Sequence, residues 1–254
     1  VEAGHTGIDT IGVFRDEYFM IPDVTLHGLG AEAWESVGGY RGITAYFYCA
    51  ELNKFVYYTS AMPVERAPDI AVTYNSELWG VSFATASKSS LMLHNGKLSQ
   101  QNQLSASSES QAVAAGALDF KAVSAIEVAD FSTLPDILWT PQGAKQNAEA
   151  VLTDYSYGKA VFDEVKQELN LPLTDMSGNT LILTAKYKDF TKKLIDNIKH
   201  YALREPCKML VKLYLEEGRM KAYPISILEQ DNIFCLSIDE TAAGGSASSR
   251  YYNW

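Results

Sequence analysis

Residues 43–59 have the sequence ITAYFYCAELNKFVYYT, which is the most aromatic stretch of the chain. It predicts two strands, 43–49 and 55–59, joined across the polar residues 51–54. Side chains alternate between the two faces of a strand, so Thr44, Tyr46 and Tyr48 share one face and the apolar residues between them share the other. Both faces are bulky, and we therefore expect this hairpin to be covered on both sides or to carry a ligand on one.

Further strands are expected on both sides of this hairpin. Asn95-Gly96 follows a short apolar run, and Asn-Gly is the pair that a type I′ hairpin turn prefers. The other expected hairpins join 8–14 to 18–21, 171–174 to 180–187, and 209–215 to 219–228, and a last strand is expected at 233–238.

Helices are expected mainly after residue 140. The apolar periodicity predicts helices over 143–152, 159–169 and 189–203, and a single helical turn over 30–36. The segment 189–203 has the most regular 3.6-residue period, and Asp189 can cap its N-terminus.

These patterns predict an α+β fold that is β-rich, with mostly antiparallel hairpins and two to four helices concentrated in the C-terminal half. The change in character near residue 140 suggests a β-rich N-terminal domain over 1–135 and an α+β C-terminal domain over 136–240. Residues 241–254 have the composition of a flexible linker-like tail.

The composition excludes several classes of protein. The chain has 254 residues, a formal net charge of −10 and 47% apolar residues, which is too apolar for a disordered chain. Three cysteines are too few for a disulfide scaffold, and no apolar run approaches the roughly 20 residues that cross a bilayer. We expect free thiols, a cytoplasmic location and no membrane partner.

Sequence motifs for cofactors and catalysis are absent. The four histidines are scattered without metal-ligand spacing, and neither a phosphate-binding glycine loop nor a nucleophile elbow occurs. We therefore expect no metal, no cofactor and no catalytic residues. If the chain is an enzyme, the glycine-rich segment 23–41 is the place to look, because Asp23, His27, Glu32, Glu35 and Arg41 gather there.

Two surfaces are candidates for binding a partner. The chain has 15 tyrosines, whose rings combine apolar area with a polar tip, and four of them lie on the aromatic hairpin: Tyr46, Tyr48, Tyr57 and Tyr58. Residues 186–212 contain eight basic and three acidic residues, a net charge of +5, whereas the rest of the chain carries −15. The basic candidates there are Lys192, Lys193, Lys199 and Lys212.

The sequence therefore favours a non-enzymatic protein-interaction or scaffolding component of a larger intracellular assembly, with a protein partner. A nucleic-acid-binding module that uses the basic helix face is the alternative, although an isoelectric point near 4.9 disfavours it. An enzyme of unrecognised type centred on residues 23–41 is the second alternative.

Overall fold

Strands dominate the fold. The computed structural model describes residues 17–140, 143–145, 147–229 and 232–239, and these are the residues discussed below. Strands account for 52% of the structure and helices for 17%, and most sheet pairings are antiparallel, which fits the α+β class broadly.

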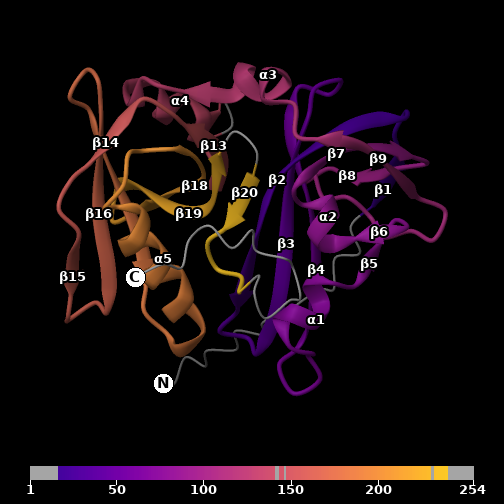
Figure 1. Ribbon diagram of the computed structural model, residues 1–254, viewed down its shortest axis with the longest axis horizontal. Coiled ribbons are helices and arrows are strands. Elements are labelled where there is room, and N and C mark those ends of the chain that lie inside the picture. Colours follow the sequence, from indigo (N-terminus) through magenta and orange to yellow (C-terminus); the bar gives the residue numbers. More distant parts are fainter. Residues whose placement is uncertain (1–16, 141–142, 146, 230–231, 240–254) are drawn as a thin grey trace, which may run out of the picture.

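The first sheet has five strands in the order β4-β3-β2-β7-β9, all antiparallel (Figure 1). Its strands are β2 (Val24–Glu35), β3 (Tyr40–Cys49), β4 (Lys54–Pro63), β7 (Ser89–His94) and β9 (Gln111–Ala117). The hairpin predicted over 43–59 is confirmed as β3 and β4, in which Tyr46 lies opposite Tyr57.

The second sheet has nine strands in the order β10-β13-β18-β19-β17-β16-β14, with β15 paired to β16 and β20 paired to β19. Its strands are β10 (Glu127–Val128), β13 (Asn147–Leu152), β14 (Tyr155–Tyr157), β15 (Val161–Asp163), β16 (Glu168–Asp175), β17 (Thr180–Lys186), β18 (Lys208–Glu216), β19 (Arg219–Glu229) and β20 (Asn232–Cys235). The hairpins predicted around residues 175–179 and 216–218 are confirmed as β16–β17 and β18–β19. Two pairings in this sheet, β10 with β13 and β17 with β19, are parallel.

Three two-stranded sheets accompany these. They pair β1 (Tyr18–Met20) with β8 (Lys97–Ser99), β5 (Glu77–Leu78) with β6 (Val81–Ser82), and β11 (Trp139–Thr140) with β12 (Gly143–Ala144). The hairpin predicted about Asn95-Gly96 is wrong. Asn95 does adopt a positive φ of 52°, but both edges of β7 are already taken by β2 and β9, so β8 pairs with β1 instead.

The helices are short and spread along the chain. They are α1 (Ile70–Tyr74), α2 (Phe83–Ala86), α3 (Phe120–Val123), α4 (Leu134–Leu138) and α5 (Lys192–Tyr201), with 3₁₀ turns η1 (Ser124–Ile126), η2 (Phe131–Thr133) and η3 (Asp189–Thr191). The prediction that they concentrate in the C-terminal half is wrong, because α1, α2 and α3 precede residue 124. The side chains of Asp69, Ser82 and Asp119 cap these three helices and stabilise single turns between strands.

The helix predicted over 189–203 is confirmed as η3 and α5, but those over 143–152 and 159–169 are wrong. Residues 147–152 pair with β18, and this tertiary pairing overrides the helical propensity of the alanines. In the other segment the Asp163 carboxylate accepts hydrogen bonds from the backbone of Val165 and Lys166, which folds a turn after β15. The helical turn predicted over 30–36 is also wrong, since these residues mostly belong to β2.

The two large sheets lie face to face, and one shared apolar cluster joins them. The alternate residues of β3 that include Ile43 and Phe47 pack against α1 and α2. One face of the second sheet packs against α4 and α5. Its other face packs against the first sheet, where Leu210 and Ile225 meet Leu29, Tyr46 and Tyr48. Figure 1 shows β2 and β3 between the remaining strands of the first sheet and the second sheet.

A bulge in β2 joins the two sheets. At Gly30 the β2–β3 register shifts and φ is +121°, which brings the β2 backbone against Ser226 of β19. The Ser226 hydroxyl donates to the carbonyl oxygen of Leu29 at 2.5 Å. Farther along β2, the backbone N–H of Ala31 donates to Cys235 Sγ at 3.3 Å, and that of Ala33 donates to Ser237 Oγ at 2.8 Å.

Three predictions about organisation remain open. The strand 8–14 and the tail 241–254 lie outside the described residues. The domain boundary near residue 135 stays a prediction, and Cys235 and Ile238 pack in the same cluster as the first sheet, so the cores interlock across it.

We expect the substitution Gly30→Ala to destabilise the fold. A Cβ at this position would lie 2.5 Å from Ser226 Cβ, and the positive φ is strained for alanine, so the cost is about 2–4 kcal/mol. Urea unfolding of Gly30→Ala and Gly39→Ala measures the difference. Gly39 also has a positive φ, of +77°, but open space around it, so only the strain of about 1–2 kcal/mol applies there. Equal losses would show that the close approach to Ser226 is unimportant.

Candidate binding groove

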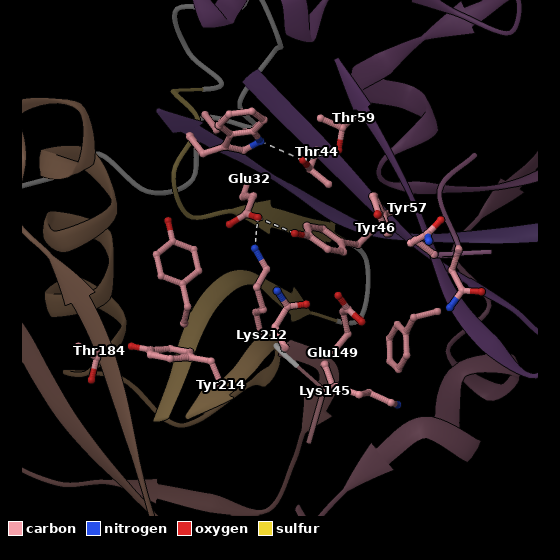
Figure 2. A pocket seen from close by; sticks show the side chains of 18 of the residues that line it. Glu32, Thr44, Tyr46, Tyr57, Thr59, Lys145, Glu149, Thr184, Lys212 and Tyr214 are labelled. Carbon is pink, nitrogen blue, oxygen red and sulfur yellow. Dashed lines mark hydrogen bonds and ion pairs between the residues drawn. The ribbon is translucent and has the colours of Figure 1, made fainter. Parts of the chain in front are cut away.

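Beyond their shared apolar cluster the two sheets separate and leave a groove of about 1160 Å³. Strands β2, β3 and β4 line one wall, and β13, β17, β18 and β19 line the other (Figure 2). The walls are rich in aromatic and amide side chains: Trp34, Tyr46, Phe55, Tyr57, Phe190, Tyr214, Tyr223, Gln100, Gln101, Asn102 and Asn147.

The wall of the first sheet follows from strand alternation. Thr44 and Tyr46 point into the groove while the residues between and beside them enter the core, as the alternation in residues 43–49 predicts. Thr44 accepts a hydrogen bond from Trp34 Nε1 at 3.0 Å and lies 2.9 Å from the hydroxyl of Thr59.

A charged cluster crosses the groove from one sheet to the other. Lys212 Nζ of β18 forms an ion pair with the Glu32 carboxylate of β2, whose side chain is 6% exposed. The Tyr46 hydroxyl donates to the same carboxylate at 2.5 Å. The Lys212 ammonium also lies 5.5 Å from the ring centre of Tyr46 and 5.7 Å from that of Tyr223, which are cation–π distances.

The tyrosines of the cluster stay protonated. Burial, together with the negative charge of Glu32, raises the pKa of both Tyr46 and Tyr223. The Tyr46 hydroxyl therefore acts as a hydrogen-bond donor to Glu32 throughout the physiological pH range.

Glu149 faces the same groove without a side-chain partner. It lies directly opposite Lys212 in the β13–β18 pairing, yet within the described chain no side chain forms a hydrogen bond or ion pair with its carboxylate. Burial raises the pKa of Glu149, the charge of Glu32 raises it further, and Lys212 and Lys145 oppose the shift.

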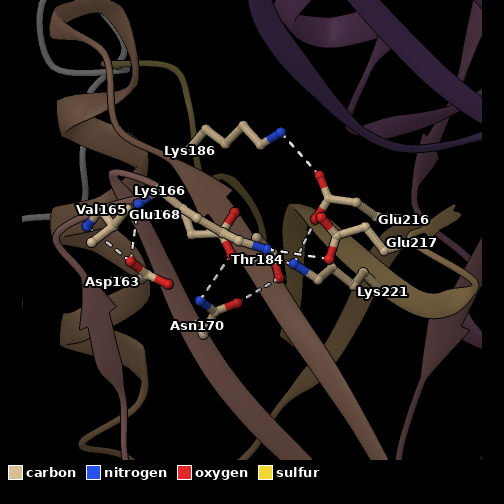
Figure 3. A network of polar contacts seen from close by, with 10 residues as sticks. All are labelled: Asp163, Val165, Lys166, Glu168, Asn170, Thr184, Lys186, Glu216, Glu217 and Lys221. Carbon is tan, nitrogen blue, oxygen red and sulfur yellow. Dashed lines mark hydrogen bonds and ion pairs between the residues drawn. The ribbon is translucent and has the colours of Figure 1, made fainter.

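A second polar network supports the far end of the groove (Figure 3). Lys221 Nζ lies 2.6 Å from Glu216 and 3.2 Å from Glu168, while Lys186 Nζ binds Glu216 at 3.0 Å. The Glu168 residue is 2% exposed, and its Oε2 has no hydrogen-bond partner among the residues described. Asn170 links this carboxylate to Thr184, which lines the groove.

The four predicted tyrosines do not form one platform. Tyr46 and Tyr57 line the groove, although Tyr46 is buried. Tyr48 is also buried and donates to Asn53 Oδ1 at 3.0 Å. Tyr58 lies on the opposite face of β4, against Trp79 and Phe83.

The four predicted lysines are separated as well. Lys212 lines the groove, whereas Lys192, Lys193 and Lys199 lie on α5 and do not. Lys193 lies 3.8 Å from Asp239, and Lys192 and Lys199 are exposed.

The acidic and basic residues of segment 23–41 do not form a catalytic cluster. This segment is strand β2 and the start of β3 rather than a loop, and an extended strand carries its side chains to distant places. Asp23 binds His94 at 2.7 Å, His27 lies 3.0 Å from Ser90, and Glu35 pairs with Arg41 at 2.6 Å. Asp23 and His27 therefore do not share a cleft with the others, whereas Glu32 and Glu35 both line the groove.

Sequence reasoning missed the wall formed by the second sheet. Tyr214 follows Lys212 by two residues in a predicted strand, so their shared face could be recognised. The sequence could not assign Glu149 to this wall, because its segment, residues 143–152, has a helical pattern.

No group of three or more histidine, cysteine, aspartate or glutamate side chains in the described ranges could hold a metal ion. Within the same ranges, no helix has the length and apolar character required to span a membrane.

Comparisons with known proteins give no family for this chain. No protein-family model and no curated protein sequence matches it. One solved structure with similarity is a replication protein A heterotrimer bound to ssDNA, at 11% identity and a TM-score of 0.35. The alignment covers 87% of this chain and 52% of that chain, so the present chain spans about half its length. This similarity is too low to carry an argument about fold or function.

We expect Lys212→Met to destabilise the protein by about 2–3 kcal/mol, because it leaves the buried Glu32 carboxylate without a countercharge. The double variant Glu32→Gln/Lys212→Met removes both charges and should lose much less. Chemical denaturation of the two variants and the parent chain measures both values. A double variant as unstable as Lys212→Met would contradict this account of the cluster.

Hydrogen bonds from Lys221 and Lys186 lower the pKa of Glu216 to about 2. Since the unfolded value is about 4.3, the carboxylate stabilises the folded state above that pH. This contribution disappears as the pH falls from about 4.3 to 2. We therefore expect the free energy of unfolding to decrease less over this interval in Glu216→Gln than in the parent chain, and Glu217→Gln serves as the exposed control. Parallel pH profiles for all three proteins would exclude this role for Glu216.

Proposed function

We propose that this chain is a non-enzymatic binding protein that holds an extended segment of a partner polypeptide in the groove, as a component of a larger assembly. The observation that supports this most directly is the groove itself, with its size of about 1160 Å³ and its aromatic and amide lining. Pockets for small molecules usually have volumes of about 300–1000 Å³, so this groove is large for such a ligand.

The lining suits a polypeptide chain. Phe55, Tyr57 and Tyr214 offer ring surface for side chains, and tyrosine is enriched at protein interfaces for this reason. The side-chain amides of Gln100, Gln101 and Asn147 provide donors and acceptors that match the N–H and C=O groups of a peptide backbone.

The charges of the groove favour a polypeptide over a nucleic acid. Of the four lysines that line the groove, Lys212 and Lys186 are already paired with carboxylates, and Glu149 would repel a phosphate beside it. The nucleic-acid alternative would use Lys192, Lys193 and Lys199 on α5, outside the groove. The predicted cytoplasmic location remains part of this proposal.

We expect the double variant Tyr57→Ala/Tyr214→Ala to weaken peptide binding about tenfold or more, since truncating interface tyrosines typically costs more than about 1 kcal/mol each. The ligands are peptides that the parent chain selects from a displayed random library, and calorimetry measures their Kd. The control is Tyr40→Ala, which removes a tyrosine that is 49% exposed and lies outside the groove. Thermal unfolding verifies that all variants are folded.

Two outcomes would count against the proposal. The first is a library from which the folded parent chain selects no peptide. The second is equal affinity in the groove variant and the control. Binding of single-stranded DNA or RNA that falls steeply with salt and depends on the α5 lysines would support the alternative.

A further inference from the structure

Lys212 does not bind its nearest acidic neighbour along the sheet. Directly opposite residues in an antiparallel pair have Cβ atoms about 4.5–5.5 Å apart, and opposite charges at such positions attract. Lys212 lies opposite Glu149 on one side and Tyr223 on the other. Its ammonium nevertheless extends across the groove to Glu32 of the facing sheet.

This arrangement leaves the Glu149 carboxyl group inside the groove without an ion pair in the described structure. Two carboxylates, Glu32 and Glu149, share the single ammonium of Lys212, and Glu32 takes it. Lys145, the next basic residue that acts on Glu149, is exposed and forms no ion pair with it in the described structure. Lys212 therefore serves two carboxylates of the groove, and Glu149 is the one with which it forms no ion pair.

We infer that the Glu149 carboxylate receives a lysine or arginine side chain of the bound polypeptide, so that the groove selects segments with a basic residue at one position. This inference depends on the proposed function and identifies the chemistry of the partner. The Lys212 site shows how the groove holds such a group, with one carboxylate and the rings of Tyr46 and Tyr223 around an ammonium.

An ion pair between Glu149 and a basic residue of the ligand makes peptide binding depend on pH. The groups that face Glu149 are Lys212, Glu32, Lys145 and Tyr46. In the free protein burial raises the pKa of Glu149, and a ligand cation beside it would lower this pKa. Binding therefore releases protons and strengthens as the pH rises through the interval between the two values.

The test uses the whole chain and a positional-scanning library of hexapeptides whose termini are acetylated and amidated, so that only side chains carry charge. We expect the parent chain to prefer lysine or arginine over the neutral glutamine at one position by about tenfold or more. Glu149→Gln, which preserves shape but removes the charge, should lose this preference and still bind neutral peptides. The control is Glu65→Gln, which removes an exposed carboxylate outside the groove and should keep the preference.

The outcomes separate this inference from the proposed function. Peptide binding without a basic preference, or with a preference that Glu149→Gln retains, would overturn the inference and leave the function intact. No peptide binding by the folded parent chain would overturn both. Calorimetry in buffers of different ionisation enthalpy provides a second readout, because proton release on binding a basic peptide should disappear in Glu149→Gln.

Discussion

The close contact between β2 and β19 at Gly30 holds the two large sheets together. Two β-sheets normally pack about 10 Å apart through interdigitating side chains. Here a bulge and the absence of a Cβ bring the backbone of one sheet directly against Ser226 of the other. Because the sheets are fixed together at this point and through the apolar cluster beside it, they can separate farther along β2. The groove is the space that this separation leaves.

The polar chemistry of the groove follows from the same geometry. Glu32 lies two residues beyond Gly30 on β2, where the facing sheets are still close enough for Lys212 to reach across. The ion pair therefore connects the walls, and its desolvation cost is reduced by the Tyr46 hydroxyl and by two aromatic rings. Glu149 remains in the groove as a carboxylate with which no side chain of the described ranges forms an ion pair.

Local patterns predicted much of this architecture. Alternation over 43–59, the turn at 216–218 and the periodicity of 189–203 each report a contact that is local in sequence, and each was predicted correctly. The errors occurred where distant pairing decides the structure: residues 147–152 become a strand because β18 lies beside them. The groove could be predicted only in part. The Tyr46 wall follows from alternation, but the pairing of Glu32 with Lys212 joins residues 180 positions apart, and no local pattern reports it.

The position of β20 has a consequence for how the protein reaches its native state during synthesis. Cys235 and Ile238 complete the apolar cluster of the first sheet, and Ser237 satisfies the backbone of β2. The ribosome therefore has to deliver residues 232–238 before a sheet that begins at residue 24 can close its core. Contacts of such long sequence separation slow folding and leave apolar surface exposed for the interval, so nascent chains of this protein should depend on chaperones until residues 232–238 have been synthesised.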